Sequence, residues 1–194
     1  MKRVFIIHGW DGYPEEGWFP WLKKELESRG FSVQVPSMPH PENPIIDDWV
    51  SFLKDSVGEP DENTYFIGHS IGCQTTLRYL ETLEGRVVGN VVLVAPWMTL
   101  SQEVWDEGEE TVATGNPWVE TPINFEKVKN MARRFICIFS EDDPAVPYEE
   151  NKRIFEEKLN AKIITTTGKG HFREEDGVQE LPSALQAVLE LAEE

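Results

Sequence analysis

The sequence predicts an α/β fold, in which a doubly wound, mostly parallel sheet of six strands is flanked by helices. Six short apolar segments alternate with segments of helical period along the 194 residues. Some of the strands, such as residues 4–7 and 91–94, are apolar at every position, which is typical of a sheet covered on both faces. Loops rich in glycine, proline and reactive side chains follow the strands, where such a sheet forms its crevice.

In the first half, the expected elements are a strand at 4–7, a helix at 18–28, a strand at 31–35, a helix from Asp47 or Asp48 to Val57, a strand at 65–67 and a helix at 73–83. Gly30 closes the first helix, because glycine readily adopts the left-handed conformation that ends helices. Phe31, Val33 and Val35 alternate as strand residues do, and Pro36 stops that strand.

In the second half, the expected elements are a strand at 87–95, a helix at 125–133, a strand at 135–139, a helix at 149–159, a strand at 162–166 and a helix at 181–191. Residues 97–122 break this rhythm and form the longest stretch without a clear period. They follow a strand of the sheet, where loops that face ligands are inserted. We therefore expect one domain, residues 1–194, with a short lid-like insertion around 97–122.

Composition limits the classes of partner. The chain has 18 Lys and Arg against 35 Asp and Glu, a net charge of −17, which argues against nucleic acid and anionic membrane surfaces. We interpret most of this acidity as a solvated surface. No apolar run is long enough to span a membrane, and the apolar start is too short for a signal peptide, so we predict a cytoplasmic protein. Cys73 and Cys137 lie in apolar segments and are expected to be buried, reduced thiols.

Residues 65–73 are the stretch around which the chain is organised. A short apolar strand runs into Gly68-His69-Ser70-Ile71-Gly72, and a helical pattern follows. This context is typical of a nucleophile elbow, a strained turn that exposes a serine hydroxyl above a parallel sheet. The two glycines fit this interpretation, because a side chain beside the strained serine would collide with the adjoining strand or helix.

Four loops, one of them this elbow, are expected at the same edge of the sheet. The loops 8–12, 68–72 and 142–147 each follow a strand, and His171 follows the last strand. The carboxyl ends of parallel strands share one edge, so these loops should meet there. A serine activated by a histidine, itself oriented by a carboxylate, performs nucleophilic catalysis, and either Asp142 or Asp143 could supply the carboxylate.

These motifs, in the chain order Ser70, Asp, His171, resemble those of an α/β-hydrolase with almost no cap. More narrowly, the chain resembles the small serine hydrolase family of retinoblastoma-binding protein 9. The resemblance covers nearly the whole chain and rests on five segments: 68–72, Asp142-Asp143-Pro144 with Val146-Pro147, 170–172, 18–25 and 125–129. One segment departs from it, since His8-Gly9-Trp10 is closer to α/β-hydrolases in general than to the glycine-rich loop of the narrower family.

The resemblance implies a role for each candidate. Ser70 would be the nucleophile and His171 its base. Asp143 rather than Asp142 would orient His171, because the acid precedes Val-Pro by this spacing in the family. Asp142 would then cap the loop or support the triad. The backbone N–H groups of Ile71 and Trp10 (with Gly9 as the alternative to Trp10) would form the oxyanion hole.

Other conspicuous residues are given structural roles. His8 is expected to brace its loop, His69 to pack or donate a hydrogen bond, and His40 to face solvent. No histidine spacing suits a metal, and no cofactor is expected. Most tryptophans at helical spacing belong to the core, but Trp97 and Trp118 flank the 97–122 insertion and are predicted to contact substrate.

The functional hypothesis is a serine hydrolase that cleaves small, uncharged or hydrophobic esters through an acyl-enzyme, with thioesters and activated amides within the same chemistry. One alternative is a peptidase-like amidase, which needs stronger protonation of its leaving group. The other is a protein-interaction module on a hydrolase scaffold, because a fold alone does not determine function. Nothing in the sequence sets the oligomeric state.

Overall fold

The computed structural model describes residues 1–85 and 87–192, and its strands form a single sheet. The strands are β1 (Arg3–Ile7), β2 (Ser32–Gln34), β3 (Thr64–His69), β4 (Val88–Val94), β5 (Ala132–Ser140) and β6 (Lys162–Thr166). They pair in the order β2-β1-β3-β4-β5-β6, and every neighbouring pair is parallel. The predicted fold class is confirmed, and the sheet is wholly rather than mostly parallel.

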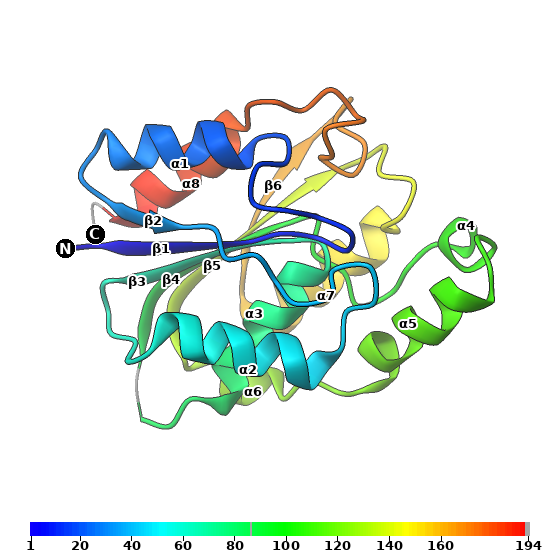
Figure 1. Cartoon of the computed structure of the whole chain (residues 1–194), viewed down its shortest axis with the longest axis horizontal. Helices are drawn as coiled ribbons and strands as arrows, with labels where there is room; N and C mark the ends of the chain where they lie inside the picture. The colour runs from blue at the N-terminus through cyan, green and yellow to red at the C-terminus, as the bar shows by residue number, and fades with distance from the viewer. Residues whose placement is uncertain (86, 193–194) are drawn as a thin grey trace.

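Helices cover both faces of the sheet. They are α1 (Phe19–Glu27), α2 (Ile46–Val57), α3 (Ile71–Thr82), α4 (Gln102–Trp105), α5 (Glu109–Glu120), α6 (Phe125–Lys129), α7 (Tyr148–Leu159) and α8 (Pro182–Ala192). Helices α1 and α8 lie over one face, and α2, α3, α6 and α7 over the other (Figure 1). Each face has its own core, since Val4 and Ile6 of β1 join one apolar cluster and Phe5 and Ile7 the other.

The crevice of the sheet is determined by its strand order. After β1, the chain adds β2 on one side of it, and then crosses over to add β3 on its other side. The loops that leave β1 and β3 therefore diverge at their carboxyl ends and open a crevice. In the register, Ile7 lies opposite Gly68, and Gly68 lies opposite Leu93. This alignment brings the ends of β1, β3 and β4 together beside Ser70.

Most element boundaries agree with the predicted ones to within two residues at each end, but the helix expected over 125–133 is wrong in length. Helix α6 ends at Lys129, and β5 already begins at Ala132. The N–H of Val88 donates to the carbonyl of Met131 (2.8 Å), and Val88 lies opposite Ala132 in the register. Pairing with β4 therefore draws this segment into the sheet, although its local sequence continues a helical pattern.

The 97–122 segment contains more regular structure than its sequence suggested. It forms α4 and the twelve-residue α5, which lie to one side, beyond the carboxyl ends of the strands (Figure 1). Two features mask the helical pattern of α5. Pro117 lies inside the helix, and the helix buries only Gly115 and Trp118. A helix with so narrow a buried face shows a weak apolar period.

The two cysteines lie in the interior, as the sequence indicated. Cys73 and Cys137 are fully buried free thiols, and burial raises the pKa of each well above its ordinary value. Within the described ranges, none of the helices combines the length and apolar character that crossing a bilayer requires.

Candidate active site

Ser70 occupies the strained turn between β3 and α3. Its backbone angles are φ 52° and ψ −121°, a region that residues with a side chain rarely adopt. The surrounding sheet holds it there, because its N–H donates to the carbonyl of Val94 at the end of β4 (3.0 Å). The serine hydroxyl is thus presented above the sheet rather than turned into it.

The glycines of the elbow allow α3 to approach the sheet closely. A Cβ built on Gly72 would lie 2.3 Å from the carbonyl oxygen of Ile7 and 2.6 Å from that of His8. A Cβ on Gly68 would lie 2.7 Å from the backbone nitrogen of Cys73. Both contacts are with backbone, which cannot move aside as a flexible side chain can. The Gly-x-Ser-x-Gly spacing is therefore a steric requirement of this turn.

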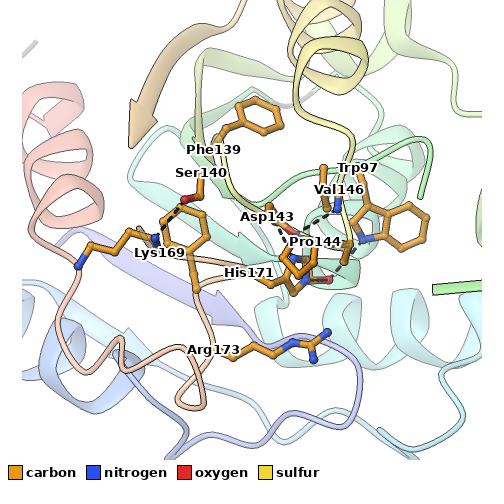
Figure 2. Close-up of polar contacts among 12 residues, drawn as sticks. Trp97, Phe139, Ser140, Asp143, Pro144, Val146, Lys169, His171 and Arg173 are labelled. Carbon is orange, nitrogen blue, oxygen red and sulfur yellow. Dashed lines mark hydrogen bonds and ion pairs between the residues drawn. The ribbon is translucent and has the colours of Figure 1, made fainter. Parts of the chain in front are cut away.

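Three predicted site residues are joined by hydrogen bonds. His171 Nε2 lies 2.8 Å from Ser70 Oγ, and His171 Nδ1 lies 2.8 Å from Asp143 Oδ2 (Figure 2). Asp143 can only accept while ionised, so Nδ1 carries the proton and Nε2 is free to accept from the serine hydroxyl. The other carboxylate oxygen, Asp143 Oδ1, accepts from the N–H groups of Ala145 (2.9 Å) and Val146 (3.1 Å).

The loop that carries His171 is fixed on both sides of the histidine. Gly170 and Phe172 both have positive φ, 49° and 60°, so the chain turns sharply around His171. Trp18 Nε1 donates to the carbonyl of Phe172 (3.1 Å), and His69 Nε2 lies 2.8 Å from the carbonyl of His171. Burial, and to a lesser extent the neighbouring His171, lowers the pKa of His69 to about 3. His69 is therefore neutral and acts as a hydrogen-bond donor to this loop.

Asp142 is placed differently from its neighbour. Its Oδ1 accepts from Ser140 Oγ (2.6 Å) and from the N–H of Gly168 (2.8 Å), and so links the loops that follow β5 and β6. The hydrogen bond from Ser140 is the main cause that lowers the pKa of Asp142 from 3.8 to about 2. The stabilisation from this ionised group is thus complete above about pH 4 and is lost as the pH falls through 2. The structure brings Asp143, and not Asp142, to His171.

His8 has no contact with the hydrogen-bonded chain of Ser70, His171 and Asp143 among the interactions of the described residues. Its Nδ1 lies 2.8 Å from the carbonyl of Gly9, and its Nε2 accepts from the N–H of Met38 (3.0 Å). Burial lowers its pKa, so the ring is neutral. It braces the loop after β1, which is the role the sequence indicated.

The two residues predicted to supply the oxyanion donors, Ile71 and Trp10, line the same cavity as Ser70. Ile71 is the first residue of α3, so its N–H is one of those that the helix itself leaves unpaired. Trp10 lines the same cavity as Ser70, and its indole N–H donates to the carbonyl of Glu42 (3.1 Å). A Cβ built on Gly9 would lie 3.4 Å from Ser70 Cβ, so the loop after β1 passes close to the serine. The assignment of these donors stays a prediction.

A cavity of about 940 Å³ opens over Ser70 and His171. Around the triad, its lining comes from the loop after β1, the loop between β2 and α2, the α4–α5 segment and the residues that follow His171. Among the residues that the structure describes, nine carboxylates line it, against one cationic side chain, Arg173. The nine are Asp11, Glu16, Glu42, Glu103, Glu107, Glu110, Glu174, Glu175 and Asp176. The negative charge of Glu174 raises the pKa of Tyr13, and burial raises that of Glu16. The acidity is thus gathered at this cavity as well as spread over the surface, which the sequence did not reveal.

The two tryptophans predicted to contact substrate lie in different places. Trp97 lines the cavity and is 2% exposed, with its indole Nε1 3.3 Å from Ser70 Oγ. Trp118 is fully buried in the core beside Trp49, and its indole N–H donates to the carbonyl of Pro44 (2.9 Å). Because Trp118 does not line the cavity, its position speaks against the predicted contact with substrate. Its flanking position in sequence was misleading, since α5 turns this side chain inward.

Sequence reasoning also missed a buried polar network behind the serine. Gln74 Nε2 donates to the carbonyl of Trp97 (3.1 Å), and Gln74 Oε1 accepts from Arg78 Nη2 (3.0 Å). Arg78 donates further to the carbonyls of Trp118 and Thr121 (2.9 Å each). The available signal was the presence of two long polar side chains, one turn apart, in a helix that is buried along most of its length.

As for metals, His, Cys, Asp and Glu form no group of three in residues 1–85 and 87–192 that could hold an ion.

The parallel sheet, with a serine elbow at its crevice, defines this chain as an α/β-hydrolase. More specifically, the chain belongs to the serine hydrolase family, whose model matches residues 4–190. The resemblance predicted from the motifs is therefore confirmed, and the protein is a hydrolase of that family.

Individual proteins similar to this chain support the same family. YdeN of Bacillus subtilis is 31% identical over 93% of this chain and 91% of its own, and its crystal structure superimposes with a TM-score of 0.89 over the whole of both chains. The serine hydrolase RBBP9 of Rattus norvegicus is 32% identical over 81% of this chain and 78% of its own. The fold is also shared with Est1E of Butyrivibrio proteoclasticus, whose structure holds ferulic acid (TM-score 0.71, 15% identity, 100% of this chain and 90% of that one).

Proposed function

We propose that this hydrolase cleaves small carboxylic esters through an acyl-enzyme formed on Ser70. The observation that carries the proposal is the hydrogen-bonded sequence Ser70–His171–Asp143 at the floor of an open cavity. Each group is suited to one role in acyl transfer, namely a nucleophile, a base in reach of its proton, and a carboxylate that fixes the tautomer of the base.

The proposed reaction has two halves. In the first, the proton of Ser70 Oγ passes to His171 Nε2 while Oγ bonds to the ester carbonyl carbon, and the carbonyl electrons move onto its oxygen. The tetrahedral intermediate expels the alcohol, which takes the proton from His171. In the second, water gives a proton to His171 and its oxygen bonds to the acyl carbon, and Oγ leaves with that proton. The N–H groups of Ile71 and Trp10 are the proposed donors to the oxyanion.

The charge of the cavity supports uncharged or cationic substrates rather than anionic ones. Within the described part of the chain, nine carboxylates against one arginine give a negative potential over the serine, and a concave site with low-dielectric walls concentrates such a field. This argues against anionic acyl groups. The same fold occurs among the carboxylesterases of Nitrososphaera gargenis, so the scaffold itself is compatible with ester cleavage.

The test is turnover of p-nitrophenyl esters of increasing acyl length by wild type and Ser70→Ala, with the matching p-nitroanilides measured beside them. We expect ester turnover to fall by about 10⁴-fold or more in Ser70→Ala, together with loss of labelling by a fluorophosphonate. Faster turnover of anilides than of esters would favour the amidase instead. A folded wild type that neither turns over an ester nor takes the label would overturn the proposal and favour the protein-interaction role.

A further inference from the structure

Ser70 Oγ has a second neighbour besides His171. The indole Nε1 of Trp97 lies 3.3 Å from Oγ, slightly longer than the usual range of about 2.7–3.2 Å for an N–H···O hydrogen bond. Catalytic hydrogen bonds in a protein without substrate are often longer than in the complex.

These two contacts account for most of the bonding capacity of the hydroxyl. A serine hydroxyl has one O–H donor and two acceptor lone pairs. The O–H is directed to His171 Nε2 (2.8 Å), and one lone pair accepts from Trp97. One lone pair remains for an incoming carbonyl carbon. The indole thus fixes the rotation of the hydroxyl as well as contacting the reacting atom.

The backbone of Trp97 is held from both sides. Upstream, Ala95 has a positive φ of 48°, and its N–H donates to the carbonyl of Ile138 (2.9 Å), so the chain leaves β4 along a fixed and strained course. Downstream, Asn151 Oδ1 accepts from the N–H groups of Met98 (2.7 Å) and Thr99 (3.1 Å). The hydrogen bond from Gln74 to the Trp97 carbonyl completes the support. Placement of this indole is therefore specified by the fold.

We propose that Trp97 is a further catalytic residue, whose indole N–H stabilises negative charge on Ser70 Oγ while the acyl–oxygen bond forms and breaks. An indole N–H only donates and does not titrate, so it cannot act as a base, and its contribution grows as Oγ becomes more negative. Oγ carries most charge when its proton has moved to His171 and when the acyl group departs. This inference rests on the proposed acyl-enzyme and replaces simple substrate contact as the role of Trp97.

The experiment removes the N–H and keeps the ring. Trp97→benzothienylalanine, which has sulfur in place of the indole N–H, is compared with wild type in burst kinetics with p-nitrophenyl acetate and in the rate of fluorophosphonate labelling. We expect both rates to fall about 10–100-fold with little change in KM, in line with the loss of a hydrogen bond to a charged group. Trp97→Phe should give a similar or larger loss.

Trp118 supplies the matched control. It is equally buried, and its N–H also donates one hydrogen bond to a carbonyl, but that bond is to Pro44 and not to the serine. Trp118→benzothienylalanine should lower the melting temperature and leave the labelling rate unchanged. Equal losses from both analogues, or a wild-type rate in the Trp97 analogue, would overturn the inference. An inert wild type would instead overturn the proposed function, and this inference with it.

Discussion

Two parts of the cavity lining, the triad wall and the helical wall, are built in different ways. The triad wall comprises residues 68–72, 140–147 and 168–171, which are tied to one another and to the sheet by backbone and side-chain hydrogen bonds. The helical wall comprises residues 102–120, the α4–α5 segment, where α4 buries no residue and α5 buries two. The triad wall therefore holds its chemistry in one geometry, and the helical wall contributes mainly charge and shape. Substitutions should separate these two contributions.

The largest effect is expected from the carboxylates of the triad wall. Asp143→Asn should lower kcat for p-nitrophenyl acetate by about 10³–10⁴-fold, because an amide no longer selects the Nδ1–H tautomer of His171. Asp142→Asn should cost far less activity, since Asp142 binds Ser140 and the Gly168 N–H instead of the histidine. The kcat of both variants is measured by steady-state kinetics. Equal losses would show that the two carboxylates share one role.

The second prediction makes the same substitution in both walls. Gly72→Ala should destabilise the fold by about 3 kcal/mol or more, because its Cβ would lie 2.3 Å from the backbone oxygen of Ile7. Urea unfolding followed by circular dichroism gives the free energy.

Gly115→Ala is the counterpart in the helical wall. Its Cβ would lie 2.9 Å from the ring of Trp105, a side chain that can move, and alanine favours a helix by about 0.5–1 kcal/mol over glycine. We expect a change within about 1 kcal/mol of zero. If Gly115→Ala were as costly as Gly72→Ala, the helical wall would be as rigid as the triad wall.

The smallest effect is expected from the charge of the helical wall. Neutralising three of its acidic residues together, Glu103→Gln, Glu107→Gln and Glu110→Gln, should lower kcat/KM for a choline ester about 2–10-fold. The kcat/KM for the uncharged 3,3-dimethylbutyl ester of the same acid should change little. In wild type, the ratio of kcat/KM for the choline ester to that for the uncharged ester should shrink as salt is raised from about 0.01 M to 0.15 M. Over this range the Debye length falls from about 30 Å to 8 Å.

A matched triple variant separates local from overall charge. Glu62→Gln, Glu126→Gln and Glu157→Gln change the net charge equally at exposed positions that do not line the cavity. This variant should keep the wild-type preference for the choline ester over the uncharged ester. A similar loss from both triple variants would attribute the preference to net charge and not to the cavity.

The triad wall was far easier to predict from sequence than the helical wall. The elbow, the order of serine, acid and histidine, and the alternation of strands and helices are all local signals. Glycines at fixed spacing and apolar periods act within a few residues. Because parallel strands share an edge, these local signals were enough to predict that Ser70 and His171 lie close together.

Other features depend on contacts between distant segments. The early start of β5 follows from pairing with β4, and the burial of Trp118 follows from its contacts with Trp49 of α2 and Arg78 of α3. The hydrogen bond from Trp97 to Ser70 needs the strained turn at Ala95, for which an alanine gives no sign in sequence. The acidic lining of the cavity unites four separate segments, so no single stretch of sequence could reveal it.

The two buried cysteines give this molecule a practical advantage for spectroscopy. Cys73 and Cys137 are inaccessible, and their raised pKa values keep them as thiols, so maleimide reagents should leave both untouched. A cysteine introduced on the exposed side of α5, for instance by Ala113→Cys, would then be the one that reacts. A fluorophore or spin label could be attached there without first removing any native residue, and movement of the helical wall could be followed during turnover.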